Sequence, residues 1–198
     1  MRLILLSILL VVFTAVGQRL GPSVALASES REELQLDDVL RRTTVVLLAE
    51  PATPTARTAE VAITPEGKQA DPVKYPPYVR RWQRWLVRAV VAGSPALVGQ
   101  VLEIGEADWQ TRLEVHRRYY LEGVSKWPIY EAYCPSYAGG SPPRSAERLI
   151  MLSGSAKAWQ FAVDDAMEST GQLPKIKEAL RRVGPDNPRL QPVAPRGR

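Results

Sequence analysis

Two segments between residues 43 and 64 have patterns of apolar and polar residues that are typical of β-strands. Residues 43–49 (TTVVLLA) are dense in β-branched side chains and predict a buried strand that Pro51 ends. Residues 57–64 alternate more weakly and predict a second strand. Six prolines are spread over residues 51–78, which we interpret as an exposed loop or an edge excursion.

Two further pairs of segments have the pattern of β-hairpins. Residues 80–92 alternate over a long span, and residues 99–104 return after a Gly-Ser-Pro turn, so we expect an antiparallel pair. Residues 148–152 form a short apolar strand. After a turn at Gly154, residues 159–163 alternate as its expected partner.

Three segments have helical signals. A Ser-x-x-Glu capping box at residue 30 predicts a short helix over residues 31–41. A second box, which follows Asp108, opens a helix with an apolar stripe that should stop at Gly123. The third helix begins near Pro174 and ends at residue 184, with apolar residues on one face.

This order of elements indicates an α+β domain that is mainly β. It fits an OB-like small barrel of about five strands with a bridging helix, which plugs one open end, and a C-terminal helix. A mixed α+β sandwich fits almost as well. We expect one domain over residues 28–184, a long loop at 125–146 and a disordered tail over 185–198, which has four prolines and little apolar bulk.

The first 27 residues have the layout of an export signal. Arg2 precedes an uncharged apolar run, and the segment closes on an A-x-A site that predicts cleavage after Ala27. The apolar run is short for a membrane span, although a retained anchor is the alternative. The sequence therefore predicts a periplasmic or extracellular protein whose membrane contact is transient and made through the signal peptide only.

Charge and cysteine content narrow the function classes. The chain has 26 Lys and Arg against 21 Asp and Glu, a formal net charge of +5, but the excess lies largely in the leader and tail. Residues 28–184 are close to neutral, so there is no strong case for nucleic acid. A single cysteine, Cys134, excludes an internal disulfide. Its simplest interpretation is a small buried apolar filler, and the alternative is a thiol that is available to another chain.

Several stretches resemble netrin-like domains of secreted bacterial proteins. These stretches are the acidic helix followed by TTVVLLA within residues 34–49, the paired strands LVRAVVAGSPALVGQVLEI at 86–104, and RLIML at 148–152. The resemblance implies an OB-like barrel. Relatives that inhibit metalloproteinases begin with a cysteine that binds the metal, and the expected mature chain begins near Ser28 without one. The resemblance therefore implies a fold only and is no basis for assigning protease inhibition.

Arginines and tryptophans interleave in one expected strand and form the strongest candidate for a binding site. Such residues can hold phosphates and stack on bases, and the same string could contact an anionic membrane or a glycan. The alternative, which we favour, is an edge strand whose arginines deter aggregation while its tryptophans pack. The candidate residues in this strand are Arg80, Arg81, Trp82, Arg84, Trp85 and Arg88.

The aromatic loop at residues 127–137 is the second candidate surface. Tyrosine and tryptophan in loops are common at recognition surfaces, and the alternative is a flap over the barrel end. Its candidate residues are Trp127, Tyr130, Tyr133 and Tyr137.

Signatures of catalysis are weak. His116 and Cys134 are the only residues of their kind and could form a nucleophile pair, but His116 lies on the apolar stripe of an expected helix. No nucleotide, metal or cofactor motif is found in the sequence, and we expect no cofactor. The sequence thus predicts a non-enzymatic binding module for an unknown protein or envelope polymer. The first alternative is a small envelope hydrolase or thiol-dependent enzyme that uses Cys134 and His116. The second alternative is a purely structural component of the envelope.

Overall fold

The structure is a computed structural model that describes residues 31–64, 71–124, 130–135, 146–155 and 158–184, together with residues 187 and 190. It confirms the α+β class. The elements are β1 (Arg31–Leu34), α1 (Leu36–Arg42), β2 (Val45–Val61), β3 (Tyr78–Ala92), η1 (Pro95–Leu97), β4 (Val101–Gly105), α2 (Trp109–Glu122), β5 (Tyr130–Tyr133), β6 (Arg148–Ser155), β7 (Ala158–Phe161), β8 (Met167–Ser169), η2 (Thr170–Gln172) and α3 (Leu173–Val183).

Five strands close into a small, uneven barrel. The sheet has the order β2-β3-β4-β7-β6-β8, and an additional pairing of β2 with β6 completes the circuit. Neighbours are antiparallel except β4 and β7, which run parallel through only two residue pairs. Both expected hairpins, 80–92 with 99–104 and 148–152 with 159–163, are therefore confirmed. The barrel has the predicted OB-like size, and the seam between β4 and β7 is its shortest ladder.

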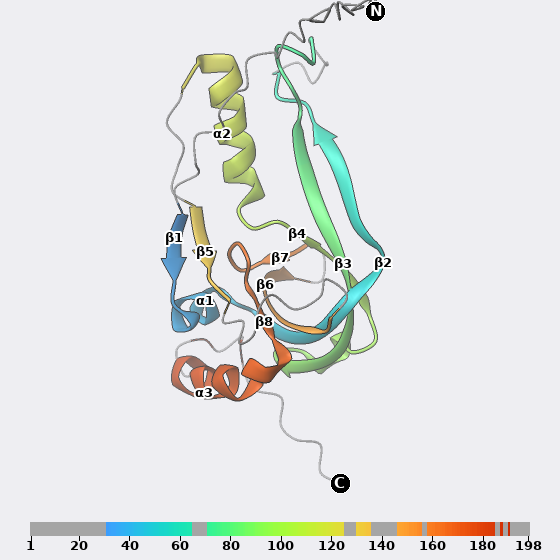
Figure 1. Cartoon of the computed structure of the whole chain (residues 1–198), viewed down its shortest axis with the longest axis vertical. Helices are drawn as coiled ribbons and strands as arrows, with labels where there is room; N and C mark the ends of the chain where they lie inside the picture. The colour runs from blue at the N-terminus through green and yellow to red at the C-terminus, as the bar shows by residue number, and fades with distance from the viewer. Residues whose placement is uncertain are drawn as a thin grey trace, which may run out of the picture.

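Strands β2 and β3 continue past the barrel as a long two-stranded arm (Figure 1). The prediction that Pro51 ends the first strand is wrong, because β2 runs on to Val61. A register shift between Pro51 and Ala56 sets this part of β2 out of regular pairing with β3, and prolines, which have no N–H to donate, are tolerated at such bulges.

Helix α2 stands beside this arm and does not plug the barrel (Figure 1). None of its residues is buried, so the expected apolar stripe is not a core face. Polar and aromatic contacts attach it instead. The Nε2 atom of His116 lies 2.8 Å from the Pro76 carbonyl oxygen, and Arg117 donates to the Ile63 carbonyl oxygen at 3.3 Å.

Helices α1 and α3 supply the apolar cover that α2 does not. The apolar face of α3, predicted from the sequence, is buried together with that of α1 in the same core as the strands. The sequence placed Asn187 and Leu190 in a disordered tail. In the structure, Leu190 is fully buried and Asn187 donates to carbonyl oxygens at the end of α1.

The start of the domain also differs from the prediction. Residues 31–34 were expected to open a helix, but they form β1, which pairs in parallel with β5 as a separate two-stranded sheet. The helix begins only at Leu36, and Gln35 at its N-cap makes no side-chain capping bond. The partner strand β5 lies about a hundred residues away along the chain, so no local pattern indicates this pairing.

Candidate ligand-binding face

The interleaved arginines and tryptophans of β3 divide between two faces, as alternation along a strand requires. Trp85 points inward and is 4% exposed, so its side chain belongs to the core. Trp82 is half-buried on the opposite face, where Gly105 of β4 and Arg57 of β2 are its register partners. On this outer face, arginine side chains contact the Trp82 ring.

Trp82 packs against two guanidinium groups. The Cζ atom of Arg57 lies 4.1 Å from the centroid of the Trp82 ring, and that of Arg80 lies 4.3 Å from it. Arg57 also forms an ion pair with Glu103 of β4 at 2.9 Å. Cation–π contacts of this kind are favourable.

Arg80 contacts a second indole, that of Trp109 at the start of α2, at 3.7 Å. Its Nε atom is buried and has no hydrogen-bond partner, and no ion pair of Arg80 is found within the described residues. Burial lowers the pKa of this guanidinium, and the nearby Glu106 partly offsets that effect. An arginine remains charged in spite of such a shift, so the positive charge stays on this surface.

These side chains line a shallow hollow beside the short seam between β4 and β7. The hollow has a volume of about 450 Å³. It is bounded by residues of β2, β3, β4 and β7 and of the segment before β4. We call this surface the β3–β4 face and define it by Arg57, Arg80, Trp82, Gln100, Glu103 and Trp159.

The other predicted arginines of β3 have different surroundings. Arg81 is exposed on the opposite side of the strand. Arg84 is half-buried and donates to the Thr53 carbonyl oxygen at 3.0 Å, and Arg88 forms an ion pair with Glu50. None of these three lines the hollow.

The two tyrosines of the aromatic loop that the structure describes lie in the interior. Tyr130 and Tyr133 are each 5% exposed, so both rings are interior. Tyr130 lies under the guanidinium of Arg112 at 4.2 Å, and the Tyr133 hydroxyl donates to the buried Glu168 carboxylate at 2.6 Å. Trp127 and Tyr137 lie outside the described residues.

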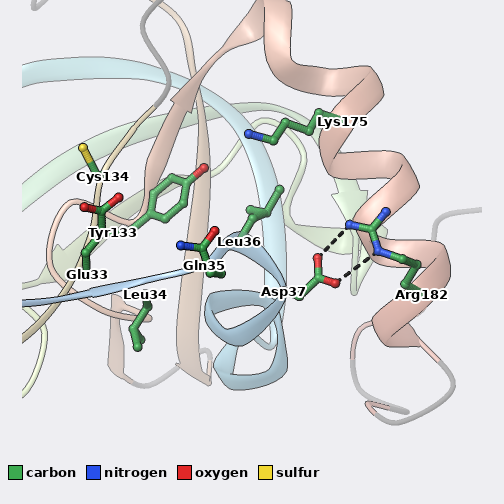
Figure 2. Close-up of a pocket in the computed structure, with 9 residues that line it drawn as sticks. All are labelled: Glu33, Leu34, Gln35, Leu36, Asp37, Tyr133, Cys134, Lys175 and Arg182. Atoms are coloured by element: carbon green, nitrogen blue, oxygen red, sulfur yellow. Dashed lines mark hydrogen bonds and ion pairs between the residues drawn. The ribbon is translucent and has the colours of Figure 1, made fainter.

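A second hollow, of about 380 Å³, lies where β1 and β5 approach α1 and α3 (Figure 2). Glu33, Tyr133, Cys134 and Lys175 line it, and an ion pair between Asp37 and Arg182 crosses from α1 to α3. The hydrogen bond from Arg182 holds the pKa of Asp37 below its ordinary value. The side chain of Cys134 is exposed, contrary to the interpretation as a buried filler.

The structure does not bring Cys134 and His116 together. The His116 ring packs edge-on against Tyr78, with the centroids 5.7 Å apart, and tilts against Tyr120. Its Nε2 atom faces the Pro76 carbonyl oxygen, which only accepts, so this nitrogen carries the proton. Cys134 lies in the second hollow among other residues, and the hydrogen-bonded pair that nucleophilic catalysis needs is not formed.

No cluster of three or more His, Cys, Asp or Glu residues able to bind a metal occurs within the described part of the chain. Likewise, none of the described helices combines the length and apolar character that crossing a membrane requires.

Comparison with known proteins finds no significant match to a family model, a curated protein or a solved structure.

Sequence reasoning found two of the six residues that define this face and missed the other four. Arg80 and Trp82 come from the string that stood out, whereas Arg57, Glu103 and Trp159 come from three other strands. A signal existed for Glu103, because the expected hairpin places residues 99–104 beside β3. Nothing in the sequence indicated that β7 would lie against β4 in parallel.

Proposed function

We propose that this chain is an exported, non-enzymatic binding module and that the β3–β4 face is its ligand-binding surface. The proposal depends mainly on one observation. Arg80 has its charge on the surface without an ion pair among the described residues, in a hollow that Trp82 and Trp159 also line.

The position of the face supports this function. In OB-type barrels, the outer surface of the second and third barrel strands and the adjoining loops bind oligosaccharides and oligonucleotides. Strands β3 and β4 occupy these two places in the circuit of this barrel. The netrin-like resemblance supports the proposal only through this barrel.

The chemistry of the face also favours binding over structure. Half-buried indoles and a partly desolvated guanidinium are typical of the residues that carry binding energy at recognition surfaces. A strand that only needed protection from aggregation would require charges but no hollow beside them. The face therefore has the chemical features of a receptor.

Retention on an affinity column tests the proposal. Envelope polymers are passed over the immobilised wild-type chain, and the retained fraction is compared with that of a Trp82→Ala variant. We expect Trp82→Ala to lose most of the retained material. Arg81→Ala, which removes an exposed arginine from the opposite side of the same strand, should retain it.

One result of this experiment would contradict the proposed binding surface. If Trp82→Ala retains the same material as the wild type and as Arg81→Ala, the β3–β4 face is not the binding surface. Urea denaturation of each variant shows whether it keeps a cooperative fold of nearly wild-type stability.

The exported location is a separate part of the proposal and is supported by the leader pattern of residues 1–27. Mass spectrometry of the protein recovered from the cell envelope should find an N-terminus at Ser28. Full-length protein in the cytosolic fraction would contradict export.

A further inference from the structure

We propose that Arg80 is a receptor for a carboxylate group and that the ligand of the β3–β4 face is an acidic oligosaccharide. This inference rests on the proposed function, because it assigns a ligand class to the same face. The Arg80 guanidinium is in contact with two aromatic rings.

The guanidinium of Arg80 contacts indoles of two different elements. Trp109 of α2 lies 3.7 Å from its Cζ atom, and Trp82 of the same strand lies 4.3 Å from it. Packing against aromatic rings uses the faces of the guanidinium plane, whereas its N–H donors point outward in that plane. The indoles therefore fix the orientation of the group and leave its donor edge for an anion.

The terminal nitrogens of Arg80 are the donors available for this purpose. The Nε atom is buried, and Arg80 itself lines the hollow. A fixed guanidinium edge matches the two oxygens of one carboxylate in a bidentate arrangement. The cost of orienting the side chain is already met in the free protein, which favours binding.

The remaining side chains of the face select a sugar over a polyphosphate. Glu103 and Gln100 offer oxygen acceptors, which sugar hydroxyl groups need. Trp82 and Trp159 offer flat apolar rings on which the C–H face of a pyranose packs. The face thus has acceptors, aromatic surfaces and one oriented cation, as a carboxylated sugar requires.

Nucleic acid fits the same surface less well. Each nucleotide adds a phosphate charge, and proteins that bind single strands line the path with several cations. Here the second arginine, Arg57, is already neutralised by Glu103, whose carboxylate would repel a neighbouring phosphate. The charges on the face therefore favour one anionic group beside neutral hydroxyls.

Calorimetric titration of the purified protein tests the assignment. The probes are tetrasaccharides of hyaluronan and of unsulfated chondroitin, in which a uronate alternates with a neutral sugar, each paired with its carboxyl-reduced neutral form. A decathymidylate serves as the nucleic-acid probe. The variants are Arg80→Gln, Arg80→Lys and Trp82→Ala, and Arg81→Gln is the matched control on the other side of β3.

We expect at least one acidic tetrasaccharide to bind more tightly than its reduced form. Arg80→Gln should weaken binding of the acidic form by about tenfold or more, because a charge-assisted hydrogen bond is lost. The same variant should leave the reduced form nearly unchanged. Arg80→Lys should recover only part of the affinity, since an ammonium group lacks the planar pair of donors. Arg81→Gln should bind like the wild type.

Each other outcome contradicts a defined part of the assignment. Equal affinity for acidic and reduced sugars, with loss in Trp82→Ala, overturns the role of Arg80 but keeps the proposed function. Tighter binding of decathymidylate than of every sugar overturns the ligand class. Absence of sugar binding, while column retention still needs Trp82, also overturns the ligand class. Absence of any dependence on Trp82 in both experiments rejects the proposed function itself.

Discussion

The side-chain amide of Asn187 donates to the carbonyl oxygen of Thr43 at 2.8 Å, and it also lies 3.2 Å and 3.3 Å from those of Leu40 and Arg41. These three carbonyls belong to the C-terminal end of α1, where helical partners run out. One side chain beyond the last helix thus completes the hydrogen bonding of the first helix.

Replacement of Asn187 by Ala should lower the free energy of unfolding by about 1.5 kcal/mol, because half-buried carbonyl oxygens lose their donor. Urea denaturation measures the change. Arg41→Ala, which removes an exposed ion pair to Asp38 in the same helix, should cost less than about 0.5 kcal/mol. Equal effects of the two variants would show that the amide contributes nothing specific.

Gly154 should tolerate no side chain. Its φ is +104°, and an added Cβ would lie 2.2 Å from the carbonyl oxygen of Ala158 in the partner strand. We expect Gly154→Ala to cost more than about 2 kcal/mol of stability. Gly123→Ala is the control, because φ is +68° there but nothing lies within 4 Å of the new carbon. It should cost only about 1 kcal/mol, and thermal unfolding of both variants separates the clash from the strain.

Arg112 attaches α2 to the barrel. It forms an ion pair with Asp164, in which the side chains are only 16% and 17% exposed, and it covers the Tyr130 ring. Arg112→Ala should destabilise the fold by about 2 kcal/mol, since a poorly solvated carboxylate loses this partner. Arg118→Ala removes a pair with Glu122 that is more than half exposed and should change the stability by less than about 0.5 kcal/mol. If both variants unfold at the same urea concentration, Arg112 does not fix the helix.

Tyr78 makes stability sensitive to alkaline pH. Burial and the hydrogen bond that its hydroxyl donates to Glu106 raise the pKa of this phenol above its ordinary value of 10.0. A pKa that is higher in the folded chain stabilises the fold at pH values below about 10, and that contribution is lost as pH rises further. Tyr78→Phe should therefore be less stable than the wild type near neutrality, and the difference should shrink at alkaline pH. Chemical denaturation across this range measures both, and a constant difference would contradict the coupling.

Cys134 should react in the folded protein. Its side chain is exposed, so a chromogenic disulfide reagent should label the native chain nearly as fully as the urea-unfolded chain. Cys134→Ser should change stability by less than about 0.5 kcal/mol. Labelling that requires prior unfolding would show that the thiol is covered.

Local patterns predicted the elements that depend on local information. The long alternation of β3, the hairpin of β6 and β7 and the apolar stripe of α3 are all present, because each is set by neighbours within a few residues. The OB-like class followed from their order.

The wrong predictions have a common cause. Burial and strand pairing depend on residues that are far apart along the chain. Trp85 and Tyr130 were candidate contact residues, but both side chains are buried because other elements pack on them. Pro51 lies inside β2 because a bulge against β3 accommodates it, and a bulge has no signature in one strand alone. Arg57, Glu103 and Trp159 joined the candidate face through the same long-range pairing.

The small sheet of β1 and β5 has a kinetic consequence. Its two four-residue strands come from positions roughly a hundred residues apart, so we expect them to meet only after the chain between them, which holds barrel strands β2, β3 and β4, has folded. This sheet should thus be assembled last and released first. Its amide hydrogens should exchange with deuterium well before those of the β2–β6 ladder. The part of the domain around the second hollow should therefore be the first to loosen.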